Sequence, residues 1–114
     1  MLKNFTLKIK NKKINIKVKI CKSLFSQLLG LMFKNESPSL LFIFRKPKKI
    51  SIHSFFCRKF IAIWLIDKNI IDIRIIKPNS LSVKPDKEFN KLLEIPENNI
   101  EFKKIQKFID DKNI

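Results

Sequence analysis

The chain contains few of the residues that form tight turns, disulfides and metal sites. Its 114 residues include one Gly, five Pro, two Cys, one His and no Tyr. So little Gly and Pro excludes collagen-like and low-complexity linker sequences. The two cysteines, Cys21 and Cys57, have no metal-ligand spacing between them. We therefore expect a reduced, cytoplasmic protein that holds no metal and no other cofactor.

Long apolar segments are absent as well. The longest apolar run, Phe60–Ile66, is much shorter than the roughly 18 to 20 residues of a membrane-spanning helix. The first residues, Met1–Phe5, lack the apolar stretch and the small-residue cleavage site of a signal peptide. The sequence thus predicts no membrane span and no targeting segment.

Apolar side chains are nevertheless plentiful. Ile, Leu, Phe and Val together number 45 of the 114 residues, whereas disordered chains usually contain less than about 20% of these four types. A chain of this length typically forms one domain. We expect a single folded domain over residues 1–114, either a monomer or a weak homodimer.

Positive charge dominates the polar residues, because 25 Lys and Arg against 10 Asp and Glu give a formal net charge of +15. Such a field attracts nucleic acid and other polyanions. A compositional explanation competes with binding, since Lys, Ile, Asn and Phe, all with A/T-rich codons, make up 63 of the residues. Only three of the cations are Arg, the residue that most often recognises bases. The small number of Arg therefore argues against recognition of base sequence. We interpret codon drift as the main cause of the charge and keep binding as the alternative.

Alternation of apolar and polar residues predicts an N-terminal hairpin over 4–20. The apolar residues of the first strand have odd numbers and those of the second strand have even numbers. Antiparallel pairing in a hairpin brings both sets to one face of the sheet. A two-residue loop at Asn11-Lys12 would place Phe5 opposite Val18. A four-residue loop over 10–13 is the alternative, because Lys is a poor substitute for the Gly that short hairpin turns favour.

A second hairpin is predicted in the middle of the chain. Residues 60–66 and 70–76 have the apolar runs of paired strands, and they flank a polar turn at Lys68-Asn69. In this register Trp64 lies opposite Ile73, so the face that carries Trp64 is expected to be fully apolar.

One helix is expected after the N-terminal hairpin. Ser23 is a suitable N-cap, leucines follow it at helical spacing, and Gly30 is a suitable C-terminal residue, which predicts a helix over 23–31. We predict strands over 40–44, 50–56 and 89–95, a basic loop over 45–49, a β-rich body over 40–95, and a C-terminal tail over 97–114 with weak helical spacing. The fold class is therefore α+β and mainly β, an antiparallel sandwich or barrel-like sheet with one helix.

Several short motifs follow one another in a characteristic order. They are Gly30-Leu31-Met32-Phe33-Lys34, Leu40–Phe44, Ile52–Phe56, Ile63–Asn69, Ile76-Lys77-Pro78 and Leu93-Glu94-Ile95-Pro96. In these motifs the chain resembles the prokaryotic domain-of-unknown-function family 192, also called uncharacterised protein family 0127. The resemblance covers about residues 21–96. It implies a small, mainly β domain with a helix before the Gly-Leu-Met motif, and it implies no established reaction.

Some positions depart from the pattern of that family. Ala62 stands where the family usually has Asp, and Gln27 and Lys34 stand where it usually has Arg. Asp67, before the second predicted turn, is retained. If the missing Asp and Arg carry the activity of the family, this chain has lost that activity. The alternative is a divergent copy with a structural role.

Nine cations are candidates for contact with nucleic acid or another polyanion. A basic two-stranded ribbon can follow phosphates, although lysines on a strand face also prevent edge-to-edge aggregation. No aromatic side chain is expected on the lysine face, because Phe5 belongs to the apolar side. The nine are Lys8, Lys10, Lys12, Lys13, Lys17, Lys19, Arg45, Lys48 and Lys49.

A second candidate site is a pocket near His53, Trp64 and Asp67. His53 and Cys57 lie on one face of a predicted strand, but the chain has no second His, and no Asp or Asn partner is evident. We therefore assign no catalytic and no metal-binding residue. Trp64 is expected in the core, where its indole N–H needs a hydrogen-bond partner.

The sequence leaves three functions open. The first, which we favour, is a non-enzymatic module that binds a ligand or partner. The second is a non-specific nucleic-acid-binding protein that uses the lysine-rich hairpin. The third is an enzyme of unknown reaction built around His53, Asp67 and neighbouring polar groups.

Overall fold

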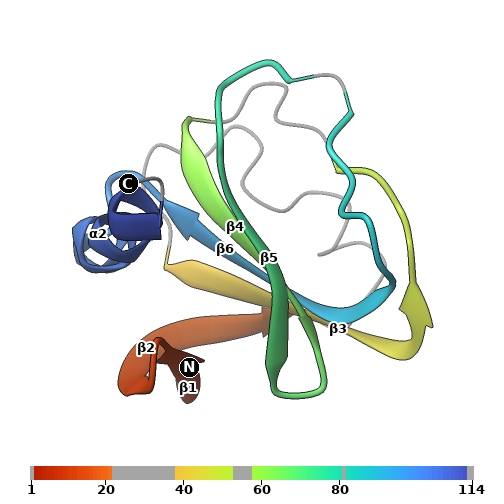
Figure 1. The fold of residues 1–114 in the computed structure, drawn as a ribbon, viewed down its shortest axis with the longest axis horizontal. Helices are drawn as coiled ribbons and strands as arrows, with labels where there is room; N and C mark the ends of the chain where they lie inside the picture. The colour runs from red at the N-terminus through yellow and green to blue at the C-terminus, as the bar shows by residue number, and fades with distance from the viewer. Residues whose placement is uncertain (1, 22–37, 53–57, 81, 113–114) are drawn as a thin grey trace.

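Six strands and one helix make up the described part of the computed structural model, which covers residues 2–21, 38–52, 58–80 and 82–112. The strands form one sheet in the order β1-β2-β3-β6-β4-β5, curled into a half-barrel (Figure 1). The sheet confirms the prediction of a mainly β, barrel-like domain. The elements are β1 Lys3–Ile9, β2 Lys12–Cys21, β3 Ser39–Lys48, β4 Phe60–Ile66, β5 Asn69–Ile76, β6 Phe89–Pro96 and α2 Ile100–Lys112.

One strand pair departs from the antiparallel sheet that the sequence predicts. β2 and β3 are parallel, whereas the other four neighbouring pairs of this sheet are antiparallel. Parallel neighbours need a long crossover connection rather than a tight turn. Residues 22–37, between β2 and β3 in the sequence, lie outside the described residues, and so does the predicted helix over 23–31.

The N-terminal hairpin is confirmed, but its predicted register is wrong. The turn lies at Lys10-Asn11, and Phe5 lies opposite Ile16 instead of Val18. Both turn residues have positive φ angles, 50° and 66°, as the two-residue turns that match strand twist require. Asn11 tolerates this conformation better than most residues, which selects this turn over both predicted loops. A shift of two residues leaves every side chain on its predicted face.

The second hairpin also turns earlier than predicted. Ile66 pairs with Asn69, so the turn is Asp67-Lys68, and Asp67 has a φ of 55°. A bulge between Trp64 and Leu65 then shifts the register, so that Trp64 lies opposite Asp72 rather than Ile73. Because a bulge adds one residue to one strand, it brings polar residues of β5 onto the face that carries Trp64.

The predicted basic loop over 45–49 is largely the end of a strand. Residues 45–48 continue β3, and Lys48 pairs with Phe89 after a shift in register. Pro47 has no N–H for a regular ladder, which accounts for an irregular segment here. The predicted strand over 50–56 is wrong for its first residues, where a single isolated bridge joins Ile52 and Val83. Residues 53–57 lie outside the described part of the chain.

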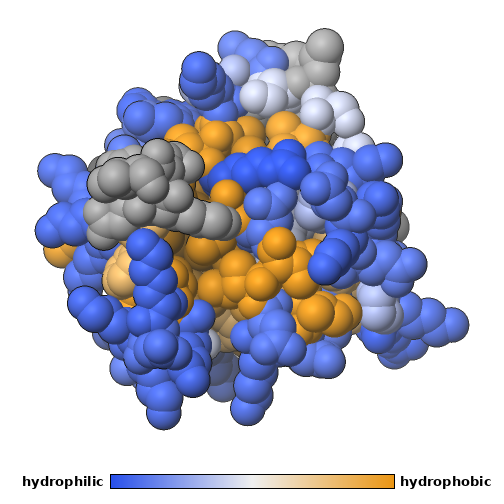
Figure 2. All heavy atoms as spheres, viewed as in Figure 1, coloured by the Kyte–Doolittle hydropathy of each residue, from blue (hydrophilic) through white to orange (hydrophobic). Residues whose placement is uncertain are grey.

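The sheet has a hydrophobic cluster on each face. The first joins side chains of all six strands to three helical residues, Phe102, Ile105 and Ile109, which confirms the helical spacing of the C-terminal tail. The second lies on the other face and includes Trp64, Phe60 and Phe89. In the view of Figure 2, hydrophilic side chains surround apolar ones near the centre of the visible surface.

Hydrogen bonds fix the start of α2 to the parallel strand pair. The side-chain oxygen of Asn99 accepts from the N–H of Glu101 at 2.9 Å, as an N-cap does. One carboxylate oxygen of Glu101 accepts from the backbone N–H of Lys17, and the other from the hydroxyl of buried Ser39, both at 2.9 Å. Within the described segments, no helix is long and apolar enough to cross a membrane.

Candidate functional site

A groove of about 720 Å³ lies between the β1–β2 hairpin and the turn of the β4–β5 hairpin. The two hairpins are far apart in the sequence, and the curl of the sheet brings the turn of the second one near edge strand β1 (Figure 1). The lining residues are Asn4, Phe5, Thr6, Lys8, Lys13, Asn15, Lys68, Asn69, Ile70 and Lys91.

Four of these residues are lysines, and none is an acid. They come from separate parts of the fold: Lys8 from β1, Lys13 from β2, Lys68 from the β4–β5 turn and Lys91 from β6. Like charges that line a concave surface reinforce one another and concentrate counter-ions there. The described lining of the groove is thus positively charged.

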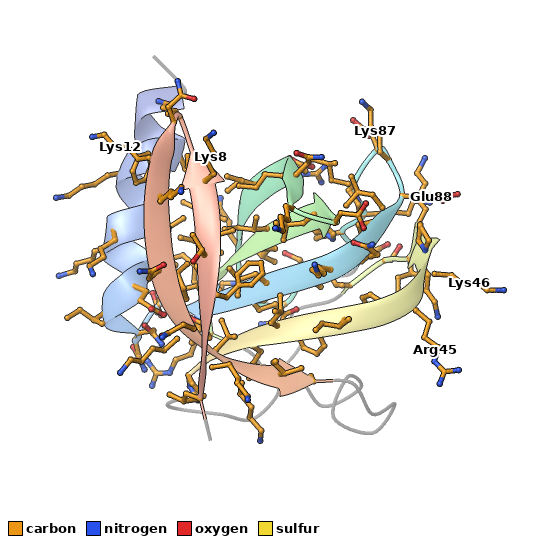
Figure 3. All side chains as sticks on the ribbon, turned by 90° about the horizontal axis from the view of Figure 1, so that it is seen from below. Lys8, Lys12, Arg45, Lys46, Lys87 and Glu88 are labelled. Atoms are coloured by element: carbon orange, nitrogen blue, oxygen red, sulfur yellow. The ribbon has the colours of Figure 1, made fainter. Side chains whose placement is uncertain are left out.

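Lys8 and Lys13 are direct partners in the hairpin register. The side chains of directly opposed residues approach closely, and two like charges in such a pair destabilise the hairpin. Figure 3 shows Lys8 projecting from β1 toward the β4–β5 hairpin, while Lys12 projects away from it. An anion that contacts both Lys8 and Lys13 would relieve their repulsion.

Asp67 holds one wall of the groove in place. Its backbone N–H donates to the side-chain oxygen of Asn90 at 2.8 Å, and the Asn90 amide donates back to the Asp67 carboxylate at 2.9 Å. The Lys91 ammonium donates to the Asp67 carbonyl at 3.0 Å. These bonds tie the turn that carries Lys68 to strand β6, so Asp67 positions groove residues without lining the groove.

Neutral hydrogen-bonding groups complete the lining. The Thr6 hydroxyl donates to the side-chain oxygen of Asn15 at 2.8 Å. This bond orients the Asn15 side chain, and the N–H₂ of an amide can still donate to a ligand. Phe5 packs against the first hydrophobic cluster, as predicted for a residue of the apolar side, and it is half-buried and also lines the groove. It does so at the edge of the sheet, where a side chain of the apolar face reaches the rim.

The nine predicted cations do not form one surface. Lys8 and Lys13 line the groove, and Lys10 lies in the hairpin turn. Lys12, Lys17 and Lys19 are exposed on β2. Arg45 and Lys48 lie at the end of β3, and Lys49 follows it. Figure 3 shows Arg45 on the opposite side of the molecule from Lys8. Lys68 and Lys91 are not among the cations predicted from the sequence, because only the fold brings them close to the N-terminal hairpin.

The predicted pocket residues lie in different surroundings. His53 is outside the described residues. Trp64 is fully buried, as predicted, and among the described residues its indole N–H has no hydrogen-bond partner. The Arg74 guanidinium lies 5.5 Å from the centre of the Trp64 ring, and it forms a 2.8 Å ion pair with Asp72. Asp67 contacts Asn90 instead of joining Trp64.

Glu94 is a buried carboxyl that the sequence reasoning did not select. It lies in the central strand β6, between Leu40 on β3 and Ala62 on β4, and 7% of its surface is exposed. Burial disfavours the charged form and raises the pKa of this carboxyl from 4.5 to about 8. At neutral pH Glu94 is therefore mostly protonated. The sequence does contain one signal of a buried carboxyl, because Glu94 is the single acid within the apolar run 92–95.

Metal-ligating residues do not gather in the described segments. Within residues 2–21, 38–52, 58–80 and 82–112, no group of three or more His, Cys, Asp or Glu side chains could hold a metal ion. The described lining of the groove offers ammonium, amide and hydroxyl groups, which are hydrogen-bond donors.

Two solved structures share this fold. A protein of unknown function from Novosphingobium aromaticivorans DSM 12444 superimposes with a TM-score of 0.74 at 15% identity, over 83% of this chain and 73% of that one. A candidate transcription regulator from Sinorhizobium meliloti 1021 superimposes with a TM-score of 0.70 at 12% identity, over 80% and 76% of the two chains. At these identities the likeness concerns the fold alone.

Sequence comparison identifies the family. A UPF0127 protein of Pyrococcus furiosus is 30% identical over 73 residues, which are 60% of this chain and 63% of that protein. The match therefore spans less than two thirds of that relative. The model of the DUF192 family, described as "Uncharacterized ACR", matches residues 5–107. The match covers nearly the whole described sheet and helix α2, and the chain therefore belongs to the DUF192 family.

Proposed function

We propose that this chain is a non-enzymatic binding module that holds an anionic ligand in the lysine-lined groove. The observation that carries the proposal is the groove itself, with four lysines from three regions of the fold and no acid in its lining. Ammonium groups form charge-assisted hydrogen bonds with anionic oxygens, and these bonds are stronger than neutral ones.

The size of the groove supports a ligand rather than a single inorganic ion. Its volume of about 720 Å³ lies within the range of about 300 to 1,000 Å³ that is usual for small-molecule sites. Three asparagines, Asn4, Asn15 and Asn69, add donors and acceptors that can orient a larger molecule.

Binding is favoured over catalysis because the lining lacks a nucleophile with an adjacent base. Among the described residues, no His, Cys, Asp or Glu lines the groove. The hydroxyl of Thr6 donates to Asn15, an amide that cannot act as a general base. The groups present can hold an anion, and they do not supply a proton-transfer pair.

Pyrophosphate is a suitable first probe of this proposal. Isotope-labelled protein is titrated with pyrophosphate, and the backbone amides are followed by NMR. We expect saturable shifts at Lys13, Lys68 and Asn69, and a loss of at least tenfold in affinity for the double variant Lys8→Gln, Lys13→Gln, because each charge-assisted bond contributes roughly 1.5 kcal/mol or more.

The matched control is the double variant Arg45→Gln, Lys46→Gln, which removes the same charge at the opposite side of the molecule (Figure 3). It should bind pyrophosphate as the unaltered chain does. Equal weakening by both double variants would show that binding depends on net charge alone, and would contradict a site in the groove.

A further inference from the structure

The groove has a lining that suits a nucleic-acid strand better than a small phosphate compound. Besides its lysines, its lining includes the half-buried aromatic residue Phe5 and the apolar residue Ile70, both of which also pack against the first hydrophobic cluster. Proteins that bind single strands without sequence preference combine a positively charged groove with an aromatic side chain on which a base stacks. Phosphate alone would require only the lysines.

Positive charge continues beyond the groove along β2. Lys17 and Lys19 are exposed and have the same parity as Lys13, so they follow it on one face of the strand. Alternate residues of a strand are spaced roughly 6.6 to 6.8 Å apart. A ligand that satisfies all these lysines must carry several phosphates in a row, as a polymer does.

Unpaired bases are needed to use Phe5. In a duplex the bases are stacked and paired, and their faces are not available to a side chain, whereas bases of a single strand can splay out and stack on aromatic rings. In the described lining of the groove there is no arginine, and arginine forms the paired hydrogen bonds that most often recognise guanine. Binding should therefore depend little on base sequence.

We infer, building on the proposed function of the groove, that its ligand is single-stranded nucleic acid. Its phosphates contact Lys8 and Lys13 and continue toward Lys17 and Lys19, and one base stacks on Phe5. The observations that carry this inference are the half-buried aromatic residue Phe5 in the lining of a cationic groove and the continuation of that charge along β2.

The test is fluorescence anisotropy with a labelled oligothymidylate, compared with a duplex of the same length. For a single strand, the logarithm of the affinity falls with the logarithm of salt by about 0.7 per phosphate contact. Four contacts predict a loss of roughly 50-fold between about 50 and 200 mM salt. The duplex should bind at least tenfold more weakly. Duplex binding as tight as that of the single strand would overturn the inference.

Two substitutions of Phe5 separate stacking from charge. Phe5→Leu should weaken oligothymidylate binding by roughly tenfold or more without changing the salt slope, because base stacking on a ring is lost. Phe5→Tyr keeps the ring and should retain the affinity. The double variant Lys8→Gln, Lys13→Gln should lower the slope by about 1.4, and Arg45→Gln, Lys46→Gln should leave it unchanged.

Crosslinking tests the unaltered chain and does not depend on how a variant folds. An oligonucleotide that contains iodouracil is irradiated in the complex, and the attached peptide is identified by mass spectrometry. Attachment at Phe5 or its neighbours supports the inference, and attachment confined to residues outside the hairpin contradicts it. If pyrophosphate binds and the oligonucleotide does not, the groove remains an anion site and the nucleic-acid inference fails. If neither binds, both proposals fail.

Discussion

At the scale of single residues, solvent exposure decides whether a titratable side chain carries a charge. The groove has exposed, charged lysines, whereas the buried face of the sheet has a neutral carboxyl. Lys8 and Lys13 are exposed, so water solvates their charges and the cost of holding them side by side is small. Glu94 is buried in the central strand, where an ionised carboxyl would lose most of its hydration. The protein therefore keeps Glu94 protonated at neutral pH, and the stability of the fold is linked to that proton.

The pKa of Glu94 predicts that the protein becomes less stable as the pH rises. The folded chain holds the proton up to about pH 8, while the unfolded chain loses it near 4.5. In this window the folded state binds more protons, so the free energy of unfolding falls with rising pH. The stabilisation is complete below the unfolded pKa and is lost by the folded pKa.

Urea unfolding at about pH 5 and pH 8 should reveal a loss on the order of several kcal/mol, since each pKa unit corresponds to about 1.4 kcal/mol. Fluorescence of Trp64 reports the transition, because it is the single Trp of the chain. The variant Glu94→Gln cannot ionise and should lose much less stability over the same range. Parallel loss in both proteins would show that another group is responsible.

At the scale of elements, turns decide how the two hairpins meet. The Lys10-Asn11 turn sets the pairing of β1 with β2, and thereby the opposition of Lys8 and Lys13. The Asp67-Lys68 turn, tied to Asn90, brings Lys68 to the groove. A one-residue change in either register would move side chains to the other face. The lysines of that hairpin would then no longer line the groove.

The conformation of the first turn predicts a stabilising substitution. Lys10 and Asn11 both have positive φ angles, and Asn-Gly is the preferred pair for such a turn. The double variant Lys10→Asn, Asn11→Gly should raise the free energy of unfolding by roughly 1 kcal/mol, because a left-handed conformation costs about that much for an ordinary residue.

The opposite substitution is the control for this turn. Lys12→Gly creates Asn-Gly at positions 11–12, the turn that the sequence pattern suggested, and favours the register that the structure does not have. It should lower the free energy of unfolding, measured by urea titration. Stabilisation by Lys12→Gly would contradict the register of β1 and β2.

At the scale of the whole molecule, a net charge of +15 repels itself. Two ion pairs are formed by described residues, Lys59 with Glu97 and Arg74 with Asp72, and such exposed pairs contribute little. Salt screens repulsion between exposed charges. Folding and polyanion binding should therefore respond to salt in opposite directions, because screening stabilises the compact chain and weakens phosphate contacts.

Calorimetry can check the response of folding to salt. Raising sodium chloride from about 20 to 300 mM should increase the free energy of unfolding by roughly 1 kcal/mol, a rise of about 4 °C in melting temperature for a domain of this size. The variant Lys8→Gln, Lys13→Gln relieves one opposed pair and should show a smaller rise. A melting temperature that falls with salt would mean that attractive pairs outweigh the repulsion.

Patterns in the amino-acid sequence are sufficient to predict the fold class, both hairpins, strand β6 and the helical spacing of the C-terminal tail. Apolar periodicity carries that information, because alternate burial along a strand and the spacing of Phe102, Ile105 and Ile109 follow from local geometry. The motifs from about residue 21 to residue 96 were sufficient to identify the family, which the match over residues 5–107 confirms.

Only the tertiary structure decided the registers, the parallel pairing of β2 with β3 and the groove. Turn conformation and the bulge beside Trp64 depend on φ angles and pairing that apolar patterns do not specify. Lys68 and Lys91 join Lys8 and Lys13 because the sheet curls, and Glu94 is protonated because neighbouring strands exclude water from it. The proximity of the four lysines and the desolvation of the Glu94 carboxyl both depend on segments that are distant in the sequence. A local sequence pattern therefore does not predict them.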